Sequence, residues 1–245
     1  MVRGLADAEH LCHVDGVEHD LLAGSVRPIV LLRRRAAGND AHGSPNALEL
    51  APSVAHDLPE LGVMLPYTPL QHLLLVAAAA HGMHAIVMTS GNLSEEPIET
   101  DDALAWEHLV AAGIADALLG NDRAILSRYD DSVVRVVDGD VMPVRRARGY
   151  APQPLSLPAL DNATPCVLAC GPQQKATIAL TREDADGHTT CFVSQHIGDV
   201  ENGATFDAWS AARTRLESLF DLAPAALACD MHPSYLSSQW AREQA

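Results

Sequence analysis

Short polar segments that follow apolar, strand-like runs carry most of the chemistry this sequence could perform. The first follows a run ending at Met88 and contains Ser90, Gly91 and Asn92. In α/β sheets ligands gather at the carboxyl ends of strands, where small hydroxyl and amide residues can donate hydrogen bonds to phosphate oxygens. The same residue types are common in turns that cap a following helix. Residues 89–94 are therefore interpreted as either a phosphate site or a helix-capping turn.

A basic cluster brings Arg145, Arg146 and Arg148 within four positions. Guanidinium groups at this spacing repel one another unless an anion or carboxylates neutralise them, and arginine binds phosphate with two parallel hydrogen bonds. A phosphate ligand would satisfy this requirement, and so would a solvated segment paired with surplus acidic residues. A second basic run, at residues 33–35, borders an irregular segment and is interpreted as solvated.

A histidine and an aspartate lie three positions apart, as His196 and Asp199, where another strand-like run ends. Such a pair is suited to holding a metal, to positioning a substrate, or to a hydrogen bond between the two side chains in a turn. His232 also follows a strand-like run and is interpreted with the same caution. The histidines show no HExxH spacing and the five cysteines include no CxxC pair, so the sequence indicates neither catalytic zinc nor a disulfide framework.

The composition is that of a folded domain, and it disfavours nucleic-acid-binding and membrane-spanning proteins. The chain has 245 residues, 48% of them hydrophobic and 20% charged, which is ordinary for a folded domain. The formal net charge of −16 disfavours binding to nucleic acid unless a local basic patch opposes it. The longest apolar run, residues 73–80, is far shorter than the roughly 20 residues that span a bilayer, and no secretory signal begins the chain. We expect a cytoplasmic protein with no membrane contact.

Hydrophobic periodicity predicts an α/β fold in two parts. In the first part we expect strands at residues 27–32 and 85–88, helices at 69–82 and 100–113, and a hairpin with a type I′ turn at 132–144. In the second we expect strands at 166–170, 177–181, 190–194 and 225–229, and helices at 206–220 and from 234. A strand meander followed by helix, strand and helix is typical of the opening of an actin-type or ribonuclease-H-type nucleotide fold.

Seven segments, taken in order, resemble the HypF family of hydrogenase-maturation carbamoyltransferases. They are residues 27–32, 61–70, 88–94, 128–133, 145–150, 194–199 and 229–235. The resemblance implies the C-terminal part of a YrdC-like domain over residues 1–155 and a proline-rich linker over 156–165. The start of a Kae1-like domain then follows over residues 166–245. The implied architecture is a partial YrdC-like twisted mixed sheet with helices, followed by the opening of an actin-type, ribonuclease-H-like Kae1 domain.

The resemblance also implies an activity, that of an ATP-dependent carbamoyltransferase. In this family carbamoyl phosphate supplies carbamate, and the YrdC-like domain joins carbamate to ATP as carbamoyl-adenylate. The Kae1-like domain then passes the carbamoyl group to the C-terminal cysteine of a HypE-type acceptor protein, where it becomes a cyanide ligand of the hydrogenase. The implied cofactor is ATP with Mg²⁺, whereas zinc or iron belongs to family regions outside this chain.

The resemblance assigns binding residues but no catalytic residue and no metal ligand. For the nucleotide in the YrdC-like domain it implies Ser90, Asn92, Ser132, Arg146 and Arg148, with either arginine pairing with an anionic oxygen. For nucleotide or substrate in the Kae1-like domain it implies Lys175, Thr177, His196 and Asp199. Lys175, the only lysine in the chain, and Thr177 align with the family's first phosphate hairpin, while Pro172, Gln173, Gln174 and Ala176 depart from its usual residues.

Two other functions stay open on the sequence alone. A YrdC-type protein could act as a threonylcarbamoyl-adenylate synthase or bind double-stranded RNA. The acidic balance argues against an RNA surface, and residues 194–199 and 229–235 have no counterpart in a stand-alone YrdC protein. A non-catalytic remnant of the family is the other alternative, because the resemblance implies that the Lys/Arg-rich triphosphate-binding segment precedes Met1.

Overall fold

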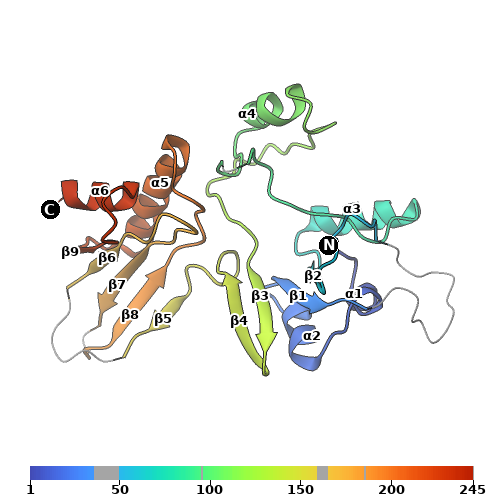
Figure 1. The fold of residues 1–245 in the computed structure, drawn as a ribbon, viewed down its shortest axis with the longest axis horizontal. Helices are drawn as coiled ribbons and strands as arrows, with labels where there is room; N and C mark the ends of the chain where they lie inside the picture. The colour runs from blue at the N-terminus through green and yellow to red at the C-terminus, as the bar shows by residue number, and fades with distance from the viewer. Residues whose placement is uncertain (36–49, 95, 159–164, 185, 245) are drawn as a thin grey trace. The chain divides into compact units, whose positions relative to one another are not determined.

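The computed structural model describes residues 1–35, 50–94, 96–158, 165–184 and 186–244. The chain divides into two compact units. Unit 1 combines Met1–Thr89 with Asp131–Gly149, and unit 2 combines Ser90–Asp130 with Tyr150–Ala245. Each unit holds one mixed β-sheet accompanied by helices (Figure 1). The α/β fold class predicted from the sequence is therefore confirmed. No helix among the described residues is long and apolar enough to cross a membrane.

Unit 1 is built on a four-stranded sheet in the order β2-β1-β3-β4. Its strands are β1 (Ile29–Arg33), β2 (Glu60–Val63), β3 (Val133–Val137) and β4 (Asp140–Arg145). β1 pairs antiparallel with β2 but parallel with β3, so segments far apart in the sequence lie side by side. Val30, Leu32 and Val134 point into the protein and are completely buried. Their spacing of two residues in β1 is the alternation that a strand with one buried face requires.

The β3–β4 hairpin and the helices of unit 1 follow local sequence signals. Asp138 and Gly139 both have positive φ, as the predicted type I′ turn demands. The helices are α1 (Leu5–Leu11), α2 (Gly16–Ala23) and α3 (Pro69–Ala80). Thr68 and Gln71 form a reciprocal capping box at the start of α3, with Pro69 in its first turn. The predicted helix at residues 69–82 is thus confirmed, ending two residues earlier.

Unit 2 contains a five-stranded sheet in the order β5-β8-β7-β6-β9. The strands are β5 (Pro154–Ser156), β6 (Val167–Ala169), β7 (Ala179–Glu183), β8 (Thr189–Val193) and β9 (Ala226–Ala228). β6, β7 and β8 form an antiparallel meander, and β9 adds to β6 in parallel. This is the opening that the sequence predicted for an actin-type or ribonuclease-H-like fold.

Helix α5 (Gly203–Phe220) packs on one side of this sheet, and α6 (Leu236–Glu243) completes the core (Figure 1). Trp209 of α5 is fully buried against Leu168 and Leu180, and its indole Nε1 donates to the carbonyl of Cys170 at 3.1 Å. An apolar body with one satisfied polar atom is how a large indole is accommodated in a core.

Residues 100–113, predicted as one helix, fold as two joined pieces. Helix α4 (Asp102–Ala105) continues into a π-helix, η1 (Trp106–Ala111). The side chain of Asp101 caps α4 by accepting from the amides of Ala103 and Leu104, as the acidic start of the segment predicted. Six residues of π-helix are unusual, because single π-turns are the common form.

The strand predicted at residues 85–88 is wrong. Only Ala85 forms a bridge, to Val2, and Ile86 exchanges two backbone hydrogen bonds with Met1. A single bridge lacks the run of successive residue pairs that defines a strand, so residues 86–88 are not part of a ladder. Conversely, α1, α2, β2 and β5 were not predicted, because they lie in segments with weak periodicity. Residues 159–164 of the predicted linker lie outside the described part, and the domain boundaries stay a prediction.

Gly171, at the end of β6, occupies a position that only glycine fits. Its φ is +72°, and a Cβ there would lie 2.0 Å from the carbonyl oxygen of Thr177, whereas Gly187 at φ +81° faces open space. We expect Gly187→Ala to lower the free energy of unfolding of unit 2 by about 1 kcal/mol. Gly171→Ala should lower it by about 3 kcal/mol or more, because steric overlap adds to the backbone strain. Denaturant titration followed by tryptophan fluorescence measures both, and equal effects would contradict the packing described.

Candidate functional site

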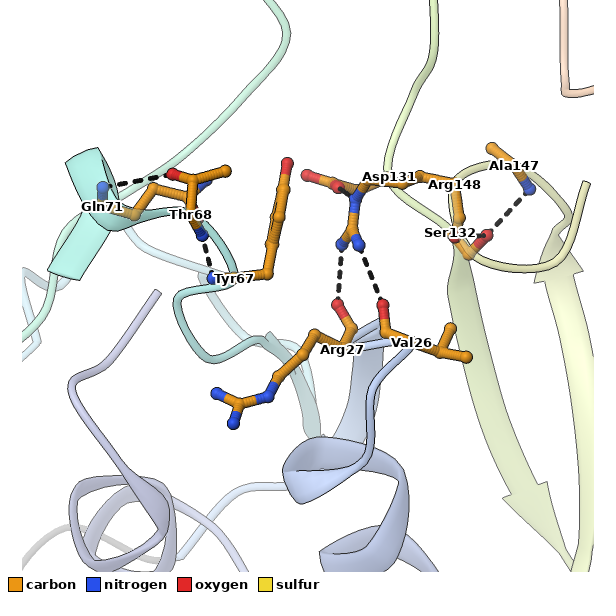
Figure 2. A network of polar contacts seen from close by, with 9 residues as sticks. All are labelled: Val26, Arg27, Tyr67, Thr68, Gln71, Asp131, Ser132, Ala147 and Arg148. Atoms are coloured by element: carbon orange, nitrogen blue, oxygen red, sulfur yellow. Dashed lines mark hydrogen bonds and ion pairs between the residues drawn. The ribbon is translucent and has the colours of Figure 1, made fainter.

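A guanidinium group organises the polar cluster of unit 1 (Figure 2). Arg148, just after β4, donates from Nε to Asp131 Oδ1 at 2.7 Å. Its other two nitrogens donate to the carbonyls of Val26 and Arg27, each at 2.8 Å. Figure 2 shows the fork of Arg148 aimed at these two neighbouring carbonyls. The planar guanidinium suits this task, because it presents several donors in fixed directions.

The ring of Tyr67 covers the same guanidinium. The central carbon of Arg148 lies 3.4 Å from the centre of the Tyr67 ring, a close cation–π contact. Burial raises the pKa of Tyr67, and the charge of Asp131 raises it further while that of Arg148 opposes the rise. The amides of Tyr67 and Thr68 both donate to Gln71 Oε1, so this contact is attached to the first turn of α3. Arg148 thereby connects the start of α3 with the chain entering β1.

Ser132 fixes the chain on the other side of the cluster. Its hydroxyl donates to the carbonyl of Arg148 at 2.9 Å and accepts from the amide of Ala147 at 2.8 Å. The Ser132 side chain is completely buried. Ser132, which was predicted to lie near the nucleotide phosphates, therefore binds the backbone groups of Ala147 and Arg148 in this structure. Arg146, on the same segment, is half-buried and has an interaction of its own.

The polar turn predicted as a nucleotide site belongs to unit 2. The amide group of Asn92 donates to the carbonyls of Leu93 and Glu96, at 2.8 and 3.0 Å, and Ser90 is exposed. The amide of Glu99 donates to the carbonyl of Gly91, which closes the loop. Asn92 thus stabilises its own turn, whereas the residue that caps the following helix α4 is Asp101, so the turn is not the helix cap that the second interpretation expected.

His108 of η1 holds this loop from the other side. Its ring Nδ1 donates to a carboxylate oxygen of Glu99, the residue whose amide binds Gly91. This hydrogen bond raises the pKa of His108; burial opposes the rise, and the charges of Glu99 and two further glutamates support it. Protonation of His108 therefore strengthens the contact that closes the loop around Asn92.

The predicted phosphate hairpin, residues 171–177, packs against residues 197–200. Asp199 Oδ1 accepts from the amide of Lys175 at 2.6 Å, and Ala176 forms an antiparallel bridge with Gly198. Lys175 has a left-handed backbone, with φ of +50°, and its side chain is exposed, whereas Thr177 is half-buried. The carboxylate of Asp199 thus compensates for a backbone that a lysine seldom adopts.

His196 and Asp199 have different partners. The ring Nδ1 of His196 donates to Asp130 Oδ2 at 3.0 Å, and each of these side chains is only 19% exposed. The chain passes from unit 2 to unit 1 at Asp130 and Asp131, and each of the two aspartates pairs with a base inside its own unit. His232 accepts from the amide of Ser234, a contact within one turn.

Side chains of the types that can ligate a metal lie together at one place among the described residues. Asp184, Asp186 and His188 lie close together in the exposed turn between β7 and β8. Asp184 Oδ1 already accepts from the amides of Asp186 and His188, so the cluster is explained as a turn.

The predicted site residues are distributed over both units. Ser132, Arg146 and Arg148 belong to unit 1; Ser90, Asn92, Lys175, Thr177, His196 and Asp199 belong to unit 2. Their roles as binding residues stay predictions. Sequence reasoning gave no role to Tyr67, Asp130 and Asp131, although segments 61–70 and 128–133 were noted for their resemblance. The two aspartates could have been found from their position, since Asp130 and Asp131 stand together directly before the hairpin predicted at residues 132–144.

Comparisons with known proteins agree with this architecture. The family described as "Telomere recombination" (Sua5, YciO and YrdC) matches residues 1–147, and the family described as "HypF Kae1-like domain" matches residues 162–245. Carbamoyltransferase HypF2 of Cupriavidus necator is 42% identical, covering 100% of this chain. Carbamoyltransferase HypF of Synechocystis is 38% identical over 94% of it. The chain belongs to the HypF family.

Two solved HypF structures share the fold. The crystal structure of full-length HypF in the phosphate- and nucleotide-bound form matches with a TM-score of 0.84 at 39% identity, covering 99% of this chain and 35% of that one. The structure of T. kodakarensis HypF matches with a TM-score of 0.84 at 27% identity, covering 100% and 29%. The chain spans 30% of the length of the Cupriavidus HypF2 and 27% of the Synechocystis HypF. Tyr67, Asp131 and Ser132 lie within residues 1–147, the part of the chain that the "Telomere recombination" family matches.

Replacement of Arg148 by lysine tests its role in unit 1. A single ammonium cannot reach Asp131 and the two carbonyls together, so Arg148→Lys should destabilise this cluster by about 2 kcal/mol. That loss corresponds to roughly 30-fold faster amide hydrogen exchange in residues 26–33 and 131–137, measured by mass spectrometry. Arg33→Lys, at an exposed position of the same unit, is the matched control. Unchanged exchange in Arg148→Lys would refute the structural role.

The raised pKa of His108 predicts a pH-dependent loop. Because protonated His108 is favoured in the folded state, the stabilisation is complete below its ordinary pKa and is lost as the pH rises through the raised value. NMR titration should give a pKa for His108 above its usual range. The signals of Gly91 and Asn92 should broaden or shift over the same pH interval. Glu99→Gln should return the pKa of His108 towards normal, and an unshifted pKa in the unmodified chain would contradict the contact.

Proposed function

We propose that this chain takes part in carbamoyl transfer as the adenylating and acceptor-facing portion of a HypF protein. The observation that carries the proposal is the succession, within one chain, of the YrdC-type match at residues 1–147 and the HypF Kae1-like match at 162–245. Two of the alternatives that the sequence leaves open, a YrdC-type synthase and an RNA-binding protein, require only the first of these regions. The second region therefore favours carbamoyl transfer.

We propose ATP with Mg²⁺ as the cofactor. The relative with a TM-score of 0.84 is described as phosphate- and nucleotide-bound. The side-chain types fit phosphate binding, since the YrdC-like part offers the hydroxyl of Ser90 and the guanidinium of Arg146, and the Kae1-like part offers the ammonium of Lys175. Asp130, Asp131 and Asp199 are each already engaged by a base or an amide, so we assign no protein ligand to Mg²⁺. ATP would supply an activated phosphorus for adenylation.

The proposed roles are of two kinds: some residues contact the nucleotide, and others position the backbone that carries those residues. Arg148 and Ser132 hold backbone, so we assign them the positioning of the segment that carries Arg146. Arg146 then contacts anionic oxygen and Ser90 contacts the nucleotide in the YrdC-like part, while Asn92 holds the turn that carries Ser90. In the Kae1-like part, Lys175 and Thr177 contact phosphate, with Asp199 fixing the backbone of Lys175. His196, held by Asp130, orients the strand end beside this hairpin.

Carbamoyl chemistry explains why such positioning matters. Carbamate is a weak nucleophile, so its attack on the α-phosphorus of ATP depends on donors already aimed at the charge that develops as pyrophosphate leaves. Donors fixed by surrounding hydrogen bonds need no reorganisation during the reaction. The acyl acceptor is proposed to be a protein thiol of the HypE type, and carbamoyl phosphate the source of carbamate.

Nucleotide binding is the direct test. Isothermal titration of the 245-residue chain with Mg·ATP should show saturable binding, and Arg146→Ala should weaken it by roughly tenfold or more, because a charge-assisted hydrogen bond to phosphate is lost. Exposed Arg33→Ala is the control and should bind as the unmodified chain does. Absence of ATP binding, or equal losses in both variants, would contradict the proposed site.

Isotope exchange distinguishes the competing functions. Labelled pyrophosphate should enter ATP when carbamoyl phosphate or a bicarbonate and ammonium mixture is supplied. Exchange that requires threonine with bicarbonate would instead favour the YrdC-type synthase. Retention of duplex RNA at low salt would favour an RNA-binding role, and ATP binding without any exchange would favour a non-catalytic remnant.

A further inference from the structure

Two parallel strands of unit 2 both end in a cysteine. Cys170 follows β6 and Cys229 follows β9, directly after the register partners Ala169 and Ala228. The ladder continues one step further, because the amide of Cys170 donates to the carbonyl of Ala228 at 2.8 Å. In a parallel ladder this bond places the donor residue opposite the residue after the acceptor. Cys170 and Cys229 therefore lie side by side.

Their side chains project from the same face of the sheet. Leu168 and Leu227 are register partners two residues earlier, and both contribute to the core that Trp209 fills. Because side chains alternate with a period of two, the thiols of Cys170 and Cys229 share that face. Neighbouring strands lie about 4.7–4.9 Å apart, within the range of roughly 4.4–6.8 Å between Cα atoms that a disulfide bridges. The separation of the two backbones thus lies within the range that a disulfide spans, and closing the bond requires only a small approach of the two Cβ atoms, which lie about 3.5–4.5 Å apart in disulfides.

The two thiols differ in accessibility. Cys170 is completely buried, whereas Cys229 is exposed. Burial raises the pKa of Cys170 to about 11, and the neighbouring Cys229 adds to the rise. Thiolate character and access decide which cysteine reacts with an oxidant. We therefore expect Cys229 to react first with an oxidant, and Cys170 to attack the resulting mixed disulfide.

The other three cysteines have no comparable arrangement. Cys12 is buried in unit 1, Cys166 lies four positions before Cys170, and Cys191 is in β8, which β7 separates from β6. None of the five cysteines, all of which the structure describes, forms a disulfide here. These three provide matched controls for chemistry at Cys170 and Cys229.

We propose that Cys170 and Cys229 form a reversible redox pair, closed to a disulfide by a small-molecule disulfide such as oxidised glutathione. The Cys229 thiolate attacks one sulfur of the oxidant, forming a mixed disulfide and releasing one glutathione thiolate. The Cys170 thiol then loses its proton and displaces the second glutathione from Cys229. Overall two protein thiols are oxidised by two electrons, and one oxidised glutathione becomes two reduced glutathiones.

The disulfide would act on the loops at this edge of the sheet. Gly171 and Asp230 follow the two cysteines directly, and their carbonyls accept from the buried hydroxyls of Ser237 and Ser238 at the start of α6. A bond between Cys170 and Cys229 would fix the spacing of these two loops. The hairpin that begins at Gly171 would then be held in one arrangement in the oxidised chain.

Oxidation of the full chain by oxidised glutathione tests the pair. After incubation and quenching with iodoacetamide, peptide mapping should find a Cys170–Cys229 disulfide, two fewer alkylated thiols per chain, and full reversal by dithiothreitol. Cys170→Ala should leave Cys229 as a stable mixed disulfide with glutathione. Cys229→Ser should leave Cys170 reduced while the chain is folded, and Cys191→Ser should cross-link as the unmodified chain does.

The result is read without nucleotide or carbamoyl phosphate, so it is independent of the proposed function. A persistent glutathione adduct on Cys229 of the unmodified chain, with Cys170 still alkylated, would overturn the proposal. So would a disulfide that involves Cys166 or Cys191. If Cys170→Ala unfolds, as circular dichroism would reveal, the peptide map of the unmodified chain alone decides.

Discussion

The charge of Arg148 is the constraint on which unit 1 depends. A guanidinium that is mostly withdrawn from water must be matched by acceptors, and here a carboxylate, two carbonyls and an aromatic face supply that match. Because these partners come from the entry to β1, the start of α3 and the start of β3, one side chain sets their spacing. The neighbouring Ser132 needs the same backbone arrangement to satisfy its own hydroxyl. An arginine-rich segment of this kind can therefore be part of the framework that presents a ligand site.

Much of the fold could be predicted from local signals. The hairpin of β3 and β4, the capping of α3 and the meander of unit 2 each depend on residues adjacent in the sequence, such as Asp138 and Gly139 or Thr68 and Gln71. The failures involve pairing between distant segments. An apolar run at residues 85–88 looked like a strand, but only Ala85 pairs, in one isolated bridge with Val2. Likewise β5, which was not predicted, forms within a proline-rich segment because it pairs with the edge of β8.

The candidate site was harder to predict than the fold, because residue type does not reveal the partner. Arg146 and Arg148 are equivalent in the sequence, yet the structure gives Arg148 a carboxylate and two carbonyls. The residue type of Asn92 suits both a ligand contact and a turn, and its amide binds two carbonyls of its own loop. His196 and Asp199 looked like a pair but have separate partners. Such choices depend on tertiary geometry that spacing alone does not encode.

The discontinuity of unit 1 has a consequence for biosynthesis. The parallel ladder between β1 and β3 joins Ile29 to Val133, so a nascent chain cannot complete this sheet until the later strand has left the ribosome. Until then the carbonyls of Val26 and Arg27 lack the arginine that satisfies them, and one edge of β1 is without a neighbour. Non-local pairing of this kind slows folding and prolongs exposure of strand edges. The free edge of β1 is therefore open to pairing with other chains until β3 has been synthesised.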